Sequence, residues 1–118
     1  MCGIVAMYSA REPIPADALE RATLRLAHRG PDGQRTWLAD DRRVGLGHAR
    51  LSIIDLATGA QPIAGEDEAL QIVVNGEFYD FERAQRDLEG RGHRLCSRSG
   101  REIAGKRFAA TPRSSRTL

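Results

Sequence analysis

The amino-acid sequence predicts a mixed α and β domain of the α+β class. Short apolar runs of strand length alternate with two segments in which apolar residues recur at helical spacing. The connections between successive strands are short, which favours antiparallel pairing in at least part of the sheet. At 118 residues, the chain is long enough for one domain with a core of its own.

The first third of the chain is expected to form a strand and then a helix. Residues 2–8 are a short, mainly apolar run that suits a buried strand. Asp17 can cap the following helix. The Gly-Pro-Asp-Gly segment at 30–33 stops that helix. Its apolar positions at helical spacing are Leu19, Ala22, Thr23 and Leu26.

The middle of the chain is expected to contribute three strands. Residues 36–39 and 44–54 are joined by an Asp-Asp turn, and residues 70–74 follow a loop and a tight acidic turn at 66–68. Gly45 and Gly47 lie on one face of the second of these strands. Glycines on one face of a strand let another backbone or a ligand come close.

A second helix is predicted after residue 79. Asp80 can cap it, and it runs to about Glu89, where Gly90 and Gly92 end it. Residues 93–97 then suit a short strand. The apolar face of the helix is expected to contain Phe81, Ala84 and Leu88.

Composition and charge exclude several classes of protein. No apolar run approaches the ~20 residues of a transmembrane helix, and two cysteines are too few for a disulfide framework. A reducing cytoplasm is therefore the expected location. Residues 105–118 hold four basic residues and no acidic residue. We expect this basic tail to be a disordered terminus, because four charges are a weak signal for nucleic acid or a membrane surface.

Cys2 is the strongest candidate for chemistry. If Met1 is removed, Cys2 carries a thiol and a free α-amine, two groups that in model peptides both titrate near pH ~8. The amine can then take the thiol proton, which places the nucleophile and its general base in one residue. Gly3 adds no side-chain bulk beside the sulfur. The alternative interpretation is a small buried cysteine without a chemical role.

Asn75 and Gly76 allow two interpretations. Asn-Gly between apolar segments is the leading signal for a type I′ hairpin turn. Alternatively, the Asn amide and the unshielded Gly N–H can point at one developing negative oxygen and form an oxyanion hole. These two residues alone leave both interpretations open.

Arg50 lies among small and apolar residues of the predicted 44–54 strand. Its guanidinium is expected to bind a planar anion such as a carboxylate, or else to be an edge-strand arginine that pairs with Asp55. His48 is expected to be structural, because Cys2 needs no separate base. His93 and Cys96 are too few ligands for a closed zinc site, so no metal is expected.

Taken in order, these motifs resemble one family. The series is Met-Cys-Gly-Ile at 1–4, His-Arg-Gly-Pro-Asp-Gly at 28–33, Gly-His-Ala-Arg-Leu-Ser-Ile-Ile-Asp-Leu at 47–56, Gln-Pro at 61–62 and Val-Asn-Gly-Glu-Phe-Tyr at 74–79. It closely resembles the N-terminal glutaminase domain of asparagine synthetase and related class II glutamine amidotransferases, which are N-terminal-nucleophile hydrolases. The likeness runs in register from residue 1 to about residue 99.

The resemblance implies a four-layer αββα sandwich that hydrolyses glutamine to glutamate and ammonia. Cys2 would attack the side-chain amide and form a glutamyl thioester, while its α-amine handles the protons. By the same likeness, Asn75 and Gly76 would form the oxyanion hole and Arg50 would hold the substrate α-carboxylate. The further residues that the resemblance places beside glutamine are Leu51, Ser52, Ile53, Ile54 and Glu77.

The resemblance also implies a receiver for the ammonia. In the family, ammonia passes to a synthetase domain that uses ATP and Mg to amidate a carboxylate, which is aspartate in asparagine synthetase. The glutaminase half itself needs no cofactor. Glutamine and a synthetase domain or chain are therefore the expected partners, without nucleic acid or membrane.

The chain departs from the family beyond its second predicted helix. The family shows Ser-Asp-x-Glu, whose Asp holds the substrate α-ammonium, whereas Gly100 stands at that position here. The likeness stops after residue 104, so we expect a domain at 1–104 that lacks its C-terminal part and the synthetase domain, through truncation or a frame shift. Two functions stay open: a glutaminase, or a non-catalytic remnant that serves as an interaction module.

Overall fold

The computed structural model describes residues 2–52, 60–65, 68–76 and 80–94. The chain divides into two compact units, of which the first comprises residues 1–62 and 73–76 and the second comprises residues 63–72 and 77–118. Both units contain antiparallel strands, and each has a helix. The predicted mixture of helices with antiparallel strands is therefore confirmed for the described residues.

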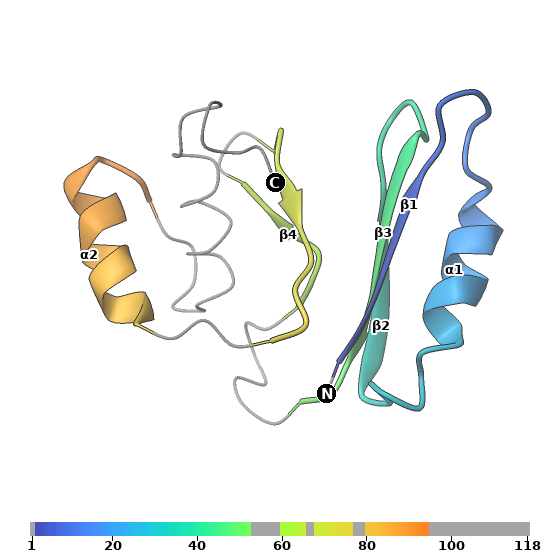
Figure 1. Cartoon of the computed structure of the whole chain (residues 1–118), viewed down its shortest axis with the longest axis horizontal. Helices are drawn as coiled ribbons and strands as arrows, with labels where there is room; N and C mark the ends of the chain where they lie inside the picture. Colours follow the sequence, from blue (N-terminus) through green and yellow to red (C-terminus); the bar gives the residue numbers. More distant parts are fainter. Residues whose placement is uncertain (1, 53–59, 66–67, 77–79, 95–118) are drawn as a thin grey trace. The chain divides into compact units, whose positions relative to one another are not determined.

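The first unit is built on a three-stranded sheet. Its strands are β1 (Gly3–Tyr8), β2 (Gly33–Leu38) and β3 (Val44–Arg50), in the order β1-β3-β2. Both pairings are antiparallel, and β3 is the central strand. Helix α1 (Ala16–Leu24) packs against all three strands and lies along one face of this sheet (Figure 1).

Helix α1 begins differently from the prediction. The residue at its N-cap is Pro15, and the Pro15 carbonyl accepts the N–H groups of Ala18 and Leu19 at 3.1 and 3.3 Å. The expectation that Asp17 caps the helix is therefore wrong. Asp17 lies inside the first turn, where its negative charge suits the helix N-terminus, and it pairs with Arg21 one turn later.

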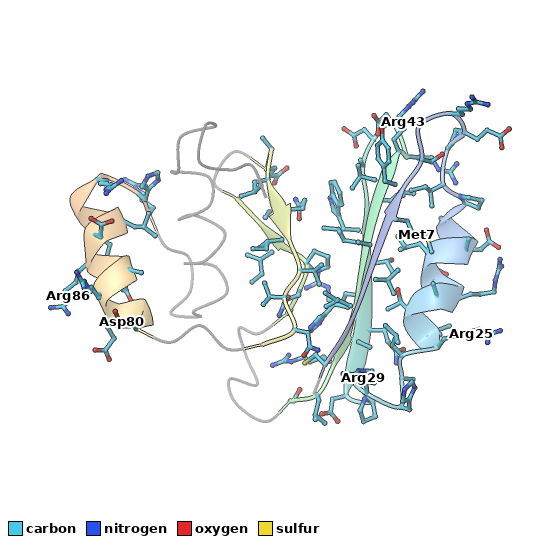
Figure 2. The ribbon with its side chains drawn as sticks, viewed as in Figure 1. Met7, Arg25, Arg29, Arg43, Asp80 and Arg86 are labelled. Carbon is cyan, nitrogen blue, oxygen red and sulfur yellow. The ribbon has the colours of Figure 1, made fainter. Side chains whose placement is uncertain are left out.

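The glycines of β3 allow α1 to approach the sheet closely. A Cβ atom at Gly47 would lie 2.1 Å from the hydroxyl oxygen of Thr23, and one at Gly45 would lie 3.0 Å from a methyl of Leu19. Thr23 and Leu19 are almost fully buried. Figure 2 shows Met7 between β1 and α1, on the same side of the sheet. The close approach predicted for this glycine face is therefore made by helix side chains.

The two strands predicted at 36–39 and 44–54 form a hairpin with different limits. The first strand starts three residues earlier, at Gly33, because all of Gly33–Leu38 pairs with β3. The second strand ends at Arg50, and residues 53 and 54 lie outside the described residues. The Ala39 N–H donates to the Val44 carbonyl at 2.9 Å and closes the turn.

The second unit contains a short antiparallel pair, β4 (Ile63–Ala64) with β5 (Gln71–Ile72). The strand predicted at 70–74 is thus only two residues long. The Gly65 N–H donates to the Leu70 carbonyl at 2.7 Å and extends the pairing by one bond. Of the predicted acidic turn, Glu68 has a positive φ of 58°, and residues 66 and 67 lie outside the described residues.

Helix α2 (Phe81–Gly90) follows the predicted limits closely, and Ala84 and Leu88 of its predicted apolar face are buried. Asp80 occupies the N-cap position with a left-handed φ of 61°, and its side chain makes no capping bond. The predicted glycine stop is confirmed at Gly92, whose φ is 87°. The Gly92 and His93 N–H groups donate to the Glu89 and Leu88 carbonyls, both at 3.0 Å, in a Schellman motif.

Residues 93 and 94 are not in a strand, and the remainder of the short strand predicted at 93–97 lies outside the described residues. The predicted basic tail also lies beyond them. Within the described parts of the chain, neither α1 nor α2 has the length and apolar character needed to cross a membrane.

Candidate active site

Cys2 stands directly before β1, and its side chain is held against the end of β3. The residue is buried, with 8% of its surface exposed, and it has a free thiol. The backbone N–H of Leu51 donates to Cys2 Sγ at 3.4 Å, and Sγ lies 3.8 Å from the Leu51 carbonyl oxygen. An N–H donor beside the sulfur can stabilise negative charge there. The structure therefore brings together Cys2 and Leu51, two residues that the resemblance assigns to one site.

Asp32 holds the chain on both sides of Leu51. The Asp32 N–H donates to the Arg50 carbonyl at 2.9 Å, and the Asp32 carboxylate accepts the Ser52 N–H at 2.6 Å. Leu51, whose N–H contacts the sulfur, is thus bracketed by two hydrogen bonds to one residue. Sequence reasoning noted the motif at 28–33 but gave Asp32 no role.

The same motif supplies two further contacts. The Arg29 guanidinium Nε donates to the Cys2 carbonyl at 3.4 Å, and Figure 2 shows Arg29 at the end of the sheet where the chain begins. A Cβ atom at Gly30 would lie 2.2 Å from the carbonyl carbon and oxygen of Ala49. Glycine is therefore required where the segment after α1 crosses the end of β3.

Arg50 ends β3, opposite Gly33 of β2, and is partly buried. Because β3 is the central strand, the interpretation of Arg50 as an edge-strand arginine is wrong. Its suggested partner Asp55 lies outside the described residues. Arg50 directly precedes Leu51, whose N–H contacts the Cys2 sulfur. The arginine that is predicted to bind a carboxylate is therefore the neighbour in sequence of the residue that contacts the thiol.

Asn75 and Gly76 are exposed and follow Val74, whose N–H donates to the Gln61 side-chain oxygen at 2.6 Å. Among described non-glycine residues, a positive φ occurs at Arg42, Glu68 and Asp80, and Asn75 is not one of these. A type I′ turn requires a positive φ at both central residues. The type I′ turn expected at Asn75-Gly76 is therefore wrong, and residues 77–79, which would continue a hairpin, lie outside the described residues.

Of the remaining residues considered from the sequence, His48 is in the core and most of the others lie outside the described residues. His48 is 2% exposed, as expected for a structural histidine on the central strand. Within the described residues, no group of three or more His, Cys, Asp or Glu side chains is arranged to hold a metal ion. The residues outside the description are Ile53, Ile54, Glu77, Cys96 and Gly100.

The fold and the site define a mixed α and β domain with a buried cysteine at the start of a strand, beside a backbone N–H donor and an arginine-bearing strand end. A sequence model of the family described as "Glutamine amidotransferase domain" matches residues 1–111. The chain belongs to this glutamine amidotransferase family.

Curated relatives agree with this assignment. The chain is 34% identical over 108 residues to "Asparagine synthetase [glutamine-hydrolyzing] 1" of Bacillus subtilis, a match that covers 87% of this chain and 17% of that protein. It is 41% identical over 96 residues to "Probable asparagine synthetase [glutamine-hydrolyzing]" of Dictyostelium discoideum, covering 78% of this chain and 16% of that protein.

A third relative has a different name. The chain is 43% identical over 100 residues to "Amidase chry2" of Gibberella zeae, covering 75% of this chain and 15% of that protein. The matches therefore span 15–17% of the lengths of these three relatives. This chain therefore shares the family of these three proteins, but it matches too little of their length for their complete reactions to be assigned to it on this ground alone.

Proposed function

We propose that this chain hydrolyses glutamine to glutamate and ammonia, with Cys2 as the nucleophile. The observation that carries the proposal is the contact of the Cys2 sulfur with the Leu51 N–H, at the end of the strand that bears Arg50. Membership of the glutamine amidotransferase family supports glutamine as the substrate.

In the proposed reaction, removal of Met1 frees the α-amine of Cys2. This amine takes the thiol proton, and Sγ attacks the side-chain amide carbon of glutamine. The Asn75 amide and the Gly76 N–H donate to the oxyanion that forms. The intermediate collapses to a glutamyl thioester, and the α-amine returns the proton to the departing ammonia. Water then hydrolyses the thioester to glutamate and regenerates the thiol.

Substrate specificity is proposed to come from the end of β3 and the segment after it. The Arg50 guanidinium can bind the α-carboxylate of glutamine through two parallel N–H donors. Residues 51–54 would line the substrate, with Glu77 at its border. A reducing compartment such as the cytoplasm would keep the Cys2 thiol free for this chemistry.

We further propose that the sheet of the first unit is one inner layer of a four-layer αββα sandwich. Gly3 faces the segment after α1, since a Cβ there would lie 2.8 Å from Leu26. Side chains alternate along a strand, so Ile4 and Tyr8 face away from α1. These two are 44% and 77% exposed, and a second sheet would bury such an apolar face.

The ammonia is proposed to be passed to a synthetase domain or chain that amidates an ATP-activated carboxylate. This step is supported by relatives whose names describe glutamine-hydrolysing asparagine synthetases. The relevant site with its ATP and Mg would lie in the part of those proteins that the present match does not cover.

One sequence observation favours a second function. Gly100 stands where the resemblance expects the Asp that holds the substrate α-ammonium. Loss of a charged partner from a binding site typically costs about 2–5 kcal/mol. A non-catalytic interaction module is therefore the alternative, and it predicts neither glutamine binding nor a reactive Cys2.

Intact-mass measurement with an electrophilic glutamine analogue separates the two functions. A glutaminase is expected to lack Met1 and to gain one adduct at Cys2, which excess glutamine blocks. The Cys2→Ala variant should gain no adduct, whereas Cys96→Ala, the matched cysteine control, should react like the unmodified chain. Retained Met1, or labelling of Cys2 and Cys96 alike without protection by glutamine, would contradict the proposal.

The role of the α-amine has its own test. A chain that keeps one residue ahead of Cys2 has a thiol but no adjacent free amine. We expect such a chain to react with iodoacetamide yet to release no ammonia from glutamine. Equal rates of ammonia release with and without the extra residue would show that another base serves Cys2.

A further inference from the structure

Gln61 is a buried polar side chain that the proposed reaction leaves without a role. It is 1% exposed and ranks among the largest fully buried side chains of the described residues. Its side-chain oxygen accepts the Val74 N–H at 2.6 Å, across 13 positions of the chain. This bond lies within the first unit and ends one residue before Asn75.

The chemistry of the amide shows which end of Gln61 matters. Val74 supplies an N–H donor, so the group that faces it must be the acceptor oxygen. The Gln61 side-chain nitrogen is buried without a hydrogen-bond partner among the described residues. An unsatisfied buried donor typically costs about 1–3 kcal/mol. An apolar side chain of similar size would avoid the cost of burying this nitrogen, but it would offer no acceptor to the Val74 N–H. The presence of glutamine at this buried position therefore suggests that its bond to Val74 has a role.

We infer that Gln61 is a positioning residue for the oxyanion hole. Its amide oxygen fixes the backbone at Val74, so that the Asn75 amide and the Gly76 N–H keep a fixed direction. Both Asn75 and Gly76 are exposed, and a Cβ at Gly76 would meet no atom of the described residues within 4 Å, so packing among these residues does little to hold the pair. Gln61 supplies the constraint from the buried side.

This inference rests on the proposed function and predicts a particular kinetic pattern. Oxyanion donors act mainly in the transition state, so their misplacement lowers kcat more than it raises KM. A simple alkylation of the thiol by iodoacetamide passes through no oxyanion. Loss of the Gln61 bond should therefore slow glutamine hydrolysis and leave alkylation of Cys2 unchanged.

The test compares three forms of the full chain: unmodified, Gln61→Met and Gln61→Glu. Methionine has a similar volume but no strong acceptor, whereas glutamate keeps an acceptor oxygen for the Val74 N–H. We expect Gln61→Met to lower kcat about tenfold or more, with KM and the iodoacetamide rate within about threefold. Gln61→Glu should recover most of kcat, and exchange of the Val74 amide hydrogen should be faster only in Gln61→Met.

The outcomes separate the inference from the proposed function. No hydrolysis by the unmodified chain would refute the proposed function and this inference with it. Hydrolysis by the unmodified chain with an unchanged kcat in Gln61→Met, or an equal loss of kcat and iodoacetamide rate, would refute only the role of Gln61. If Gln61→Met does not fold, Gln61→Asn, which withdraws the same amide by one methylene, is judged by the same criteria.

Discussion

At the scale of single residues, the hydrogen bond to the sulfur of Cys2 comes from a backbone that another residue holds. Asp32 bonds to the backbone on both sides of Leu51, and the Leu51 N–H donates to the Cys2 sulfur. Replacing Asp32 with Ala removes the acceptor for Ser52. Because a hydrogen bond contributes about 1 kcal/mol, we expect roughly fivefold slower alkylation of Cys2 and a comparable loss in glutamine turnover. The rate of iodoacetamide labelling measures the alkylation of Cys2, and the rate of ammonia release measures the turnover of glutamine.

The chain contains a matched control for this prediction. The Asp41 carboxylate accepts the Arg43 N–H at 3.1 Å, a bond of the same kind. Figure 2 shows Arg43 at the opposite end of the sheet from Arg29. Asp41→Ala should leave the reactivity of Cys2 unchanged, and Asp32→Asn, which keeps one acceptor oxygen, should retain most of it. Equal effects of Asp32→Ala and Asp41→Ala would show that Asp32 acts only on general stability.

Residues with intrinsic chemistry could be found from the sequence, whereas residues that act by position could not. Cys2 and Arg50 were candidates because a thiol beside an amine and a guanidinium among apolar residues are unusual, and the family resemblance then assigned their roles. The contacts of Arg29, Asp32 and Gln61 join residues 27, 20 and 13 positions apart. Local sequence patterns contain no information about such long-range pairings. The motifs at 28–33 and 61–62 nevertheless contain all three of these residues.

At the scale of elements, the segment after α1 must pass very close to β3. A Cβ at Gly30 would lie 2.2 Å from the Ala49 carbonyl, whereas one at Gly33 would meet no atom within 4 Å. Neither glycine is among those with a positive φ. We therefore expect Gly30→Ala to lower the free energy of unfolding by about 1–3 kcal/mol and Gly33→Ala to change it by less than about 1 kcal/mol. Urea denaturation measures both, and equal losses would contradict the steric explanation.

Helix α1 has one surface ion pair whose pH dependence can be predicted. A hydrogen bond from Arg21 lowers the pKa of Asp17 below its ordinary value of 3.8, and the Arg21 charge acts in the same direction. The pair therefore stabilises the fold above pH ~4, and this contribution is lost as pH falls through the lowered pKa. Because both side chains are exposed, the effect on stability should be small. Arg21→Ala should raise the Asp17 pKa in an NMR titration, and an unchanged pKa would contradict the pairing.

A helix end was predicted correctly where it depends on a backbone conformation that glycine favours, and less well where it was expected to depend on a capping side chain. Gly92 was expected to follow α2, and its left-handed φ forms the Schellman motif. Asp17 and Asp80 were both expected to cap through their side chains, and neither does so. Pro15 already fixes the entry to α1, and the left-handed backbone at Asp80 differs from the extended conformation of a capping residue. These backbone conformations depend on the preceding loop, which residue type alone does not specify.

At the scale of the whole molecule, the resemblance predicts more than periodicity could. Strand and helix periods indicated a mixed α and β domain, and the described strands are antiparallel in both units. The positions of Cys2 and Arg50 at one end of one sheet follow from the pairing of β1 with β3. That pairing brings together residues almost 50 positions apart, which no local pattern could predict.

Binding of glutamine should stabilise the whole chain, because a ligand that binds only the folded state shifts the unfolding equilibrium. The Cys2→Ala variant is suited to this measurement, since it cannot consume the substrate. At a glutamine concentration of 100 times Kd, we expect about 2.7 kcal/mol of added stability. For a domain of this size, that corresponds to a rise in Tm of roughly 10 °C.

A pair of arginine variants in the Cys2→Ala background links this stabilisation to the proposed site. Arg50 is expected to hold the α-carboxylate through a bidentate pair, a geometry that lysine cannot reproduce. Arg35 lies two residues inside β2, is exposed, and has no assigned role. At the same glutamine concentration, Arg50→Lys should lose most of the rise in Tm and Arg35→Lys should keep it. Equal rises in both variants would place the carboxylate site elsewhere, and no rise in the Cys2→Ala parent would favour the interaction module over the glutaminase.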